Sequence, residues 1–219
     1  MNGIIREYYL ASKDDECGFV YAACKHGYIN LLMYLHNIGT VIPNDSISTA
    51  SFFGQLLAVK YLCSIGIDPK ADNDYAIRIA SHNGHLDVVK YLHSVGADPA
   101  ADNSYAIIWA SQMGHFPVVK YLHMAGANPT AGDDHALICA CHAGHLNIVK
   151  YLCSVGADPT ARDNDPIIWA SDWGHLAVVK YLHSIGADPT ARDNTPIRVA
   201  RCGCYYSVIE YLRKNGASE

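Results

Sequence analysis

A ten-residue motif that recurs every 30 residues constrains this chain more than any other feature. The motif begins at Lys60 as KYLCSIGIDP, and four related copies follow without insertion, the last beginning at Lys180 as KYLHSIGADP. A column of alanines keeps the same spacing from Ala50 to Ala200. Self-similarity at a fixed period of this length indicates stacked copies of one small structural element, not one or two conventional globular domains.

Counting outward from these columns divides the chain into seven repeats and a leading segment. We expect residues 1–219 to form a single repeat domain. Residues 1–12 contain the fragment IIREYYL and are predicted to add a partial helix as an N-terminal cap. The shorter spacing at 40–45 predicts an irregular junction between the first two repeats. The predicted repeats are 13–39, 40–70, 71–100, 101–130, 131–160, 161–190 and a C-terminal capping repeat at 191–219.

Each repeat is predicted to hold two short helices. In the repeat 71–100, the turn-forming residues 72–74 precede a first helix, AIRIASHN, which Gly84 ends because glycine accepts the left-handed cap. In two later repeats Asp165 and Thr195 precede a proline, as a capping residue does at a helix start. The second helix, HLDVVKYLHSV, carries an apolar stripe at helical spacing. One such hairpin buries its apolar faces only by stacking on its neighbours, so the predicted fold class is all-α.

These residues carry a resemblance to a known family. DNTPIRVA at 193–200 and GHLDVVKYLHSVGADP at 84–99 resemble the ankyrin repeat, whose pattern runs T-P-L-H-x-A-A, then G-H-x-x-V-V-K-x-L-L, then G-A-D. The likeness covers roughly residues 13–219. It implies an ankyrin-repeat solenoid of about seven helix-turn-helix units that binds other proteins.

The repeat departs from the family pattern in two ways. Each copy has 30 residues where the usual ankyrin repeat has 33, and the deletion falls where the family places a hairpin finger, so shortened hairpin loops are expected. The 30-residue period is similar to that of ankyrin proteins encoded by giant DNA viruses that infect amoebae (mimivirus-like). The histidine of T-P-L-H is replaced by Arg78, Ile108, Ile138, Ile168 and Arg198.

Composition and charge exclude several classes of protein. The formal net charge is -5, which does not suit a nucleic-acid binder, since such proteins carry excess positive charge. No apolar run is long enough for a transmembrane helix, so no membrane partner is expected. Arg6 and Glu7 stand where a signal peptide needs an apolar core, so we expect an intracellular, cytoplasmic protein, in the host cell if it is viral.

The first-helix residues that point away from the core are predicted to line the concave groove of an ankyrin-like stack. With positions 77 and 80 facing the core, positions 79 and 83 point largely away from it. These two columns hold all three tryptophans, and the column through position 82 is the most varied near the groove. The predicted protein-binding residues are Phe52, Phe53, Ile79, His82, Asn83, Trp109, Gln112, Met113, His142, Trp169, Asp172 and Trp173.

Two alternatives remain open for this surface. Trp109 and Trp169 could lie flat between adjacent helices and simply fill that side of the stack, as aromatic residues at helical spacing often do. The acidic loop residues, such as Asp72 and Asp163, could form a rim that attracts a basic partner, or they could only form turns and cap the first helix.

The 12 histidines and eight cysteines do not predict a metal site. Equivalent residues of stacked helices lie roughly 8–10 Å apart, whereas two ligands of one zinc ion lie within about 4.5 Å of each other. The local cluster HALICACHAGH lacks the paired C-x-x-C spacing of a zinc module. We therefore predict no metal and no cofactor, with the cysteines acting as small apolar fillers and the histidines packing and hydrogen bonding.

The lysine and tyrosine columns of the second helix have similarly simple interpretations. The lysines from Lys60 to Lys180 are predicted to form a solvated outer face, with attraction of an acidic partner as the alternative. The tyrosines from Tyr34 to Tyr211 are predicted to pack between repeats with their hydroxyl groups in water.

The favoured function is a non-enzymatic scaffold or adaptor that binds a partner protein through the groove. No nucleophile, base and orienting group converge outside the repeating columns, so no catalytic residue is predicted. The alternative is a structural protein that self-assembles through the same groove or an end repeat. We expect a monomer rather than a homo-oligomer, and the partner's identity does not follow from the sequence.

Overall fold

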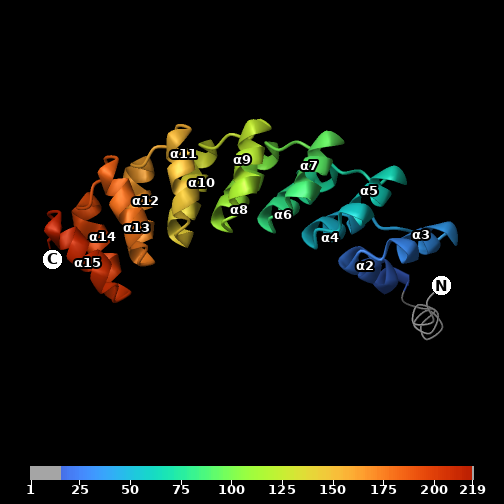
Figure 1. Cartoon of the computed structure of the whole chain (residues 1–219), viewed down its shortest axis with the longest axis horizontal. Helices are drawn as coiled ribbons and strands as arrows, with labels where there is room; N and C mark the ends of the chain where they lie inside the picture. Colours follow the sequence, from blue (N-terminus) through green and yellow to red (C-terminus); the bar gives the residue numbers. More distant parts are fainter. Residues whose placement is uncertain (1–15, 219) are drawn as a thin grey trace. The chain divides into compact units, whose positions relative to one another are not determined.

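The computed structural model describes residues 16–218, and the helix predicted within residues 1–12 lies outside them. Over the described residues every regular element is a helix, and the helices form seven successive pairs (Figure 1). The chain divides into two compact parts, Met1–Asp98 and Pro99–Glu219, here called the N-terminal unit and the C-terminal unit.

The N-terminal unit contains three helix pairs. Their bounds are α2 Glu16–His26, α3 Ile29–Asn37, α4 Ser46–Phe52, α5 Leu56–Ser64, α6 Ala71–His82 and α7 Leu86–Ser94. The C-terminal unit contains four pairs. Their bounds are α8 Ala101–Gln112, α9 Phe116–Met124, α10 Ala131–Ala143, α11 Leu146–Ser154, α12 Ala161–Asp172, α13 Leu176–Ser184, α14 Ala191–Cys202 and α15 Tyr206–Lys214.

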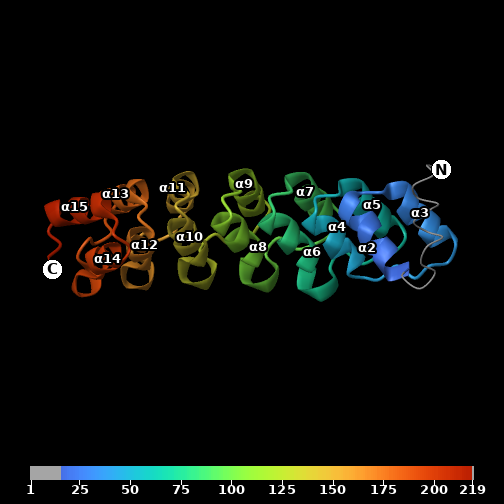
Figure 2. The ribbon, with the colours of Figure 1, turned by 90° about the horizontal axis from the view of Figure 1, so that it is seen from below.

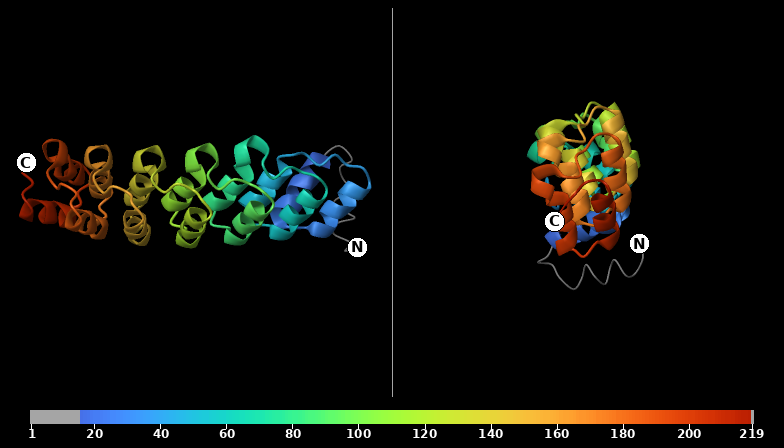
Figure 3. Two further views of the ribbon diagram at one scale, coloured as in Figure 1. Left: turned by 90° about the horizontal axis from the view of Figure 1, so that it is seen from above. Right: turned by 90° about the vertical axis from the view of Figure 1, so that its left-hand side faces the viewer.

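Each unit has two layers of helices. The first helices of successive pairs pack on one another, as α4 does on α2 and α6, and α12 on α10 and α14. The second helices form the other layer, as α5 does with α3 and α7. Figure 2 shows the two rows, and the left panel of Figure 3 shows the loops that join the pairs. The layers confirm the all-α class expected from the repeat pattern.

The core consists of the columns that hardly change between repeats. The alanines from Ala50 to Ala200 have no exposed surface, and neither do the leucines from Leu62 to Leu212. The small alanine side chain lets neighbouring first helices approach closely, and the leucine fills the space between the two layers. Each fully buried leucine contributes about 1.5–3 kcal/mol of transfer free energy.

The predicted turns before the first helices have an unexpected backbone. Three consecutive residues adopt left-handed angles at 72–74, 102–104, 132–134, 162–164 and 192–194. The third side chain of such a triplet accepts the N–H of a residue 24 positions later: Asp74 accepts from Asp98 at 3.0 Å, and Asn164 from Asp188 at 2.8 Å. The triplets therefore join one repeat to the next.

Helix capping by Asp165 and Thr195 was predicted wrongly. The Thr195 hydroxyl donates to the Arg192 carbonyl oxygen, and the Asp165 carboxylate forms an ion pair with Arg192 at 2.9 Å. Both side chains therefore have other partners at the position where a cap would accept a helix N–H.

The junction between the first two repeats is irregular, as the spacing predicts. Residues 40–45 contain no left-handed triplet, whereas residues 72–74 at the start of α6 form one. The missing triplet changes the turn by which this repeat begins.

The histidines of the G-H motif join neighbouring repeats within each unit. Nε2 of His85 donates to the Phe52 carbonyl oxygen at 2.9 Å, and Nε2 of His175 to the His142 carbonyl oxygen at 3.0 Å. A Cβ added at Gly54 would lie 2.5 Å from the His85 ring, so a glycine is needed there. The packing and hydrogen-bonding role predicted for these histidines is confirmed.

Candidate protein-binding surfaces

Trp169, Trp173 and His142 form an exposed cluster on the first-helix layer of the C-terminal unit. Trp169 lies in α12 and Trp173 directly follows it, so the two share one helix face at a spacing of four residues. Their side chains are 38% and 49% exposed. The His142 ring, at the end of α10, lies 5.5 Å from the Trp169 ring and 4.7 Å from the Trp173 ring. We call these three residues the tryptophan cluster.

The cluster has a defined geometry because its histidine is anchored. The His142 carbonyl oxygen accepts from His175, which directly precedes α13. This bond ties the end of α10 to the turn between α12 and α13, and so fixes the backbone of His142 beside both indoles. The alternative that Trp169 only fills space between helices is inconsistent with its exposed side chain.

Asp172 places a carboxylate on the same helix face as the cluster. It is half-buried and lies three residues after Trp169. Within residues 16–218 its side chain has no hydrogen bond or ion pair. Two basic residues in the turns before α12 and α14 are engaged elsewhere: Arg162 donates to the Gly132 carbonyl oxygen, and Arg192 pairs with Asp163 and Asp165. Arg198 and Arg201 are exposed on the neighbouring helix α14.

The equivalent positions of α8 present a less aromatic surface. Trp109 is half-buried, with its ring 5.8 Å from that of Tyr105 in an edge-on contact. Met113 is 45% exposed and Gln112 is exposed. Because α8 packs on α10 and α10 on α12, these side chains lie on the same layer as the cluster, two helices away.

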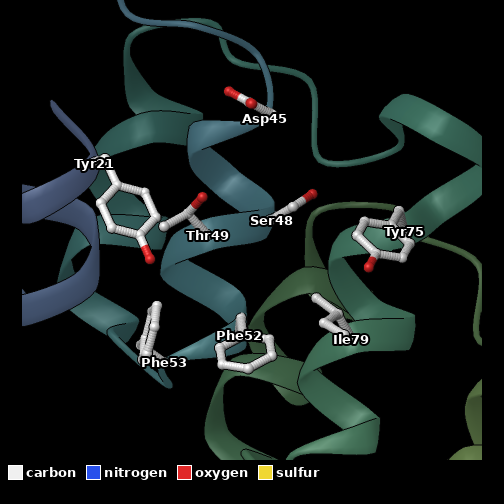
Figure 4. A pocket seen from close by; sticks show the side chains of 8 residues that line it. All are labelled: Tyr21, Asp45, Ser48, Thr49, Phe52, Phe53, Tyr75 and Ile79. Atoms are coloured by element: carbon white, nitrogen blue, oxygen red, sulfur yellow. The ribbon is translucent and has the colours of Figure 1, made fainter. Parts of the chain in front are cut away.

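The N-terminal unit carries a hollow with a volume of about 430 Å³ on its first-helix layer (Figure 4). Tyr21 of α2, Phe52 of α4 and Tyr75 of α6 contribute rings from three helices, and the Phe52 and Phe53 rings meet edge to face at 4.8 Å. Figure 4 shows Asp45 at one end, away from the phenylalanines. We call it the aromatic hollow; its lining is Tyr21, Asp45, Ser48, Thr49, Phe52, Phe53, Tyr75 and Ile79.

Two cations of the chain already contact the rings of this hollow. Nζ of Lys25 lies 5.5 Å from the centre of the Phe53 ring and 5.9 Å from that of Tyr21. The Arg78 guanidinium lies 5.4 Å from the centre of the Tyr75 ring. These are cation–π contacts, so three of the four rings are paired within the chain.

A family model described as Ankyrin repeats (3 copies) matches residues 19–133 and 128–193, which is more than half of the chain. The chain belongs to the ankyrin-repeat family. No curated protein matches the chain. Ankyrin repeats generally mediate interactions between proteins, and ankyrin-repeat proteins are typically non-enzymatic scaffolds. The narrower likeness to proteins of giant viruses has no support among these comparisons.

Sequence reasoning missed five of the eight residues that line the aromatic hollow. Tyr21, Asp45, Ser48, Thr49 and Tyr75 were not predicted as site residues. One signal was available: Ser48 occupies the column in which other repeats carry isoleucine or arginine, such as the buried Ile168. A small side chain there leaves room beside the two phenylalanines.

Several residues predicted for the groove contribute little open surface. Ile79 keeps 8% exposure, because its short side chain lies beside the larger Phe52 and Tyr75 in the wall of the hollow. The Asn83 amide donates to the Ile79 carbonyl oxygen at 2.8 Å, so it serves the end of its own helix. His82 is half-buried.

Some of the acidic residues in these turns have structural partners. Asp74 accepts a backbone N–H from the next repeat, and burial raises its pKa; burial also raises the pKa of Asp134. Asp163 pairs with Arg192 at 3.1 Å, although its side chain is largely exposed. The side chains of Asp72 and Asp133 are exposed, so the turn and acidic-rim interpretations both stay open for them.

The HALICACHAGH segment places its cysteines in or against the core. Cys141 is fully buried and Cys139 half-buried, and burial raises the pKa of the Cys139 thiol to about 11. A raised thiol pKa disfavours the thiolate that a metal ion binds. Between residues 16 and 218 no group of three His, Cys, Asp or Glu side chains could hold a metal ion, and no helix is long and apolar enough to cross a membrane.

The lysine and tyrosine columns interact with each other across the repeats. Nζ of Lys150 lies 5.6 Å from the centre of the Tyr181 ring, and Lys180 has the same contact with Tyr211. The Tyr211 hydroxyl is hydrogen-bonded to Nδ1 of His183 at 2.8 Å. The prediction of hydroxyl groups in water is therefore wrong for this tyrosine, because the preceding repeat supplies a histidine partner.

Proposed function

We propose that the protein is a non-enzymatic scaffold that binds a partner protein through the exposed face of its first helices, with the tryptophan cluster as the central contact. The observation that carries this proposal is that Trp169 and Trp173 are exposed side by side on one helix face, whereas the alanine and leucine columns of the core are fully buried. Tryptophan is enriched among the residues that dominate binding energy at protein interfaces.

The size of the cluster suits the centre of an interface rather than the whole of it. With about 40% of each side chain exposed, the two indoles offer roughly 100–200 Å² of surface. A standard interface buries about 800 Å² on each partner. The remaining contacts would come from Met113 and Gln112 on α8 and from Asp172 beside the cluster.

Capture of partners with matched variants tests this function. The full chain and a Trp169→Ala/Trp173→Ala variant are immobilised and exposed to the same cell lysate. Met124→Ala is the control, because Met124 is 82% exposed but lies at the end of α9, in the other helix layer. We expect at least one protein that the wild type and the control retain and the tryptophan variant loses. Identical captured proteins for all three would contradict the proposed site.

The choice of lysate follows from the repeat length. The likeness of the 30-residue repeat to ankyrin proteins of giant viruses favours a host-cell protein as the partner, so amoebal lysate is the first sample. In this proposal the protein acts in the cytoplasm, on that partner and without catalysis.

Self-assembly through the same face is the alternative function. Exposed tryptophans also suit contacts between copies of one chain, and light scattering over a range of protein concentrations separates the two. We expect a constant monomer mass. A mass that rises with concentration, and no longer rises in the tryptophan variant, would favour self-assembly.

A further inference from the structure

Aromatic rings in this protein are repeatedly paired with a cation of the same chain. On the second helices Nζ of Lys60 lies 5.6 Å from the centre of the Tyr91 ring, and Lys150 and Lys180 contact their tyrosines at the same distance. On the first helices of the N-terminal unit, Lys25 and Arg78 contact three rings of the aromatic hollow. In each contact a positive charge lies against the negative face of the ring.

The two tryptophans of the cluster lack such a cation, as Phe52 of the aromatic hollow does. In the part of the chain that the structure describes, neither Trp169 nor Trp173 has a lysine or arginine over its ring. Tryptophan binds cations more strongly than tyrosine or phenylalanine does. These two exposed indoles are therefore strong cation-binding rings, and the aromatic neighbour that they share within residues 16–218 is His142.

The charges around the cluster favour an incoming cation. Asp172 adds a carboxylate on the same helix face. The half-buried positions of α10 nearest the cluster hold Cys139, His142 and Ala143, none of which is a lysine or arginine. Arg198 is exposed on α14, which packs on the opposite side of α12 from α10. Because both indoles contact His142, they lean toward α10 and away from this arginine.

We infer that the tryptophan cluster binds an arginine or lysine side chain of the partner protein, with Trp169 and Trp173 contacting the cation and Asp172 supplying the opposite charge. This inference rests on the proposed function and names the chemistry of its central contact. Such a contact becomes stronger when it is partly desolvated at an interface.

A selection from random peptides tests the inference without a known partner. Peptides displayed on phage are selected on the full chain and sorted by whether the Trp169→Leu/Trp173→Leu variant still retains them. Circular dichroism and thermal unfolding verify that the variant is folded. Among the peptides that need the tryptophans, we expect an arginine or lysine at one recurring position. Replacing it with norleucine should weaken binding about tenfold.

A charge-only variant makes the test independent of the tryptophan substitutions. Asp172→Asn keeps the size of the side chain and should weaken the basic peptide several-fold while leaving its norleucine version unchanged. Asp133→Asn is the matched control, since it removes an exposed carboxylate from the turn before α10. We expect it to have little effect, because screening weakens charges that lie beyond about 8–10 Å.

The outcomes separate this inference from the proposed function. Peptides that need the tryptophans but share no basic residue would overturn the cation inference and leave the binding surface intact. An Asp172→Asn variant that weakens both peptide versions equally would also overturn it. If no selected peptide depends on the tryptophans, both the surface and its cation chemistry are wrong.

Discussion

The two units present different surfaces from the same repeat. In the N-terminal unit, Phe52 and Phe53 border a hollow whose rings already contact cations of the chain. At the equivalent positions of the C-terminal unit, Asp172 and Trp173 project a carboxylate and an indole that contact no cation among residues 16–218. The alanine and leucine columns beneath both surfaces are equally buried, so the core leaves the exposed columns free to differ.

The difference arises from single side chains at equivalent positions. Ser48 opens the hollow, whereas Ile168 in the same column is buried and fills that space. These changes leave the hydrogen bonds between repeats in place, since His85 and His175 make the same contact in their respective units. A repeat protein of this kind varies its binding surfaces without altering its core.

The largest effect on stability is expected from substitutions in the leucine column, which forms the core of both units. Leu62→Ala and Leu182→Ala each remove a fully buried side chain, one in each unit, and should each lower the free energy of unfolding by about 2–5 kcal/mol. Urea denaturation followed by circular dichroism measures both losses. Losses that differ by more than about 2 kcal/mol, which is the spread that the local fit of a cavity allows, would show that the two cores are not equivalent.

A smaller loss of stability is expected when the glycines that contact the histidine rings are replaced. Gly54→Ala and Gly144→Ala place a Cβ 2.5 Å from the rings of His85 and His175, at backbone angles that only glycine adopts easily. Each should cost about 1–3 kcal/mol more than Gly66→Ala, because overpacking adds to the backbone strain. Gly66 is the control, since it has a positive φ and nothing within 4 Å of its added Cβ. Equal losses at all three glycines would mean that the histidine contact contributes nothing.

Filling the aromatic hollow should abolish binding at that surface and leave binding at the tryptophan cluster, with little change in the stability of the fold. Ser48→Ile gives this repeat the residue found at the equivalent Ile168 and should change the free energy of unfolding by less than about 1 kcal/mol. Captured proteins that depend on Phe52 should be lost, and those that depend on Trp173 should remain. Loss of both sets would mean that the two surfaces do not act separately.

The smallest effect on stability is expected at two half-buried carboxylates. Burial raises the pKa of Asp74 and Asp134, so their stabilising contribution is present below the usual aspartate pKa and is lost as the pH rises through the raised value. Asp74→Asn and Asp134→Asn keep the acceptor oxygen, as Asn164 does naturally. Each should raise stability at neutral pH by less than about 0.5 kcal/mol.

Thermal unfolding at acidic and neutral pH measures this effect in both variants. The gain in stability that asparagine gives should shrink at acidic pH, where aspartate is also neutral. An advantage that grows on acidification would have the wrong sign and would contradict the role of burial.

The repeat made most of the fold predictable from the sequence. Its fixed period predicted the helix pairs, and its invariant alanines and leucines predicted the core, because burial restricts which side chains fit. The left-handed triplets were not predictable in this way: aspartate and asparagine indicate a turn, but the handedness of three successive residues, as at 72–74, depends on the bond to the next repeat.

The candidate site was only partly predictable. The columns correctly located Trp169 and Trp173 on an exposed face, since helical periodicity determines the side of the helix on which each side chain lies. They could not give the exposure of Ile79 or the volume beside Ser48, because both depend on the sizes of side chains from neighbouring helices. The cation contacts of Lys25 likewise depend on distances that a linear pattern does not contain.

The bonds between repeats also have a consequence for how such a chain changes in length. The acceptor in each left-handed triplet and its N–H donor lie 24 residues apart, within a 30-residue period, and the histidine–carbonyl contacts span 33 residues. A 30-residue segment cut at any point therefore carries one donor and one acceptor of each kind. Duplication or loss of whole copies in the gene would leave every joint complete, and each new copy would bring one more first helix to carry its own recognition residues.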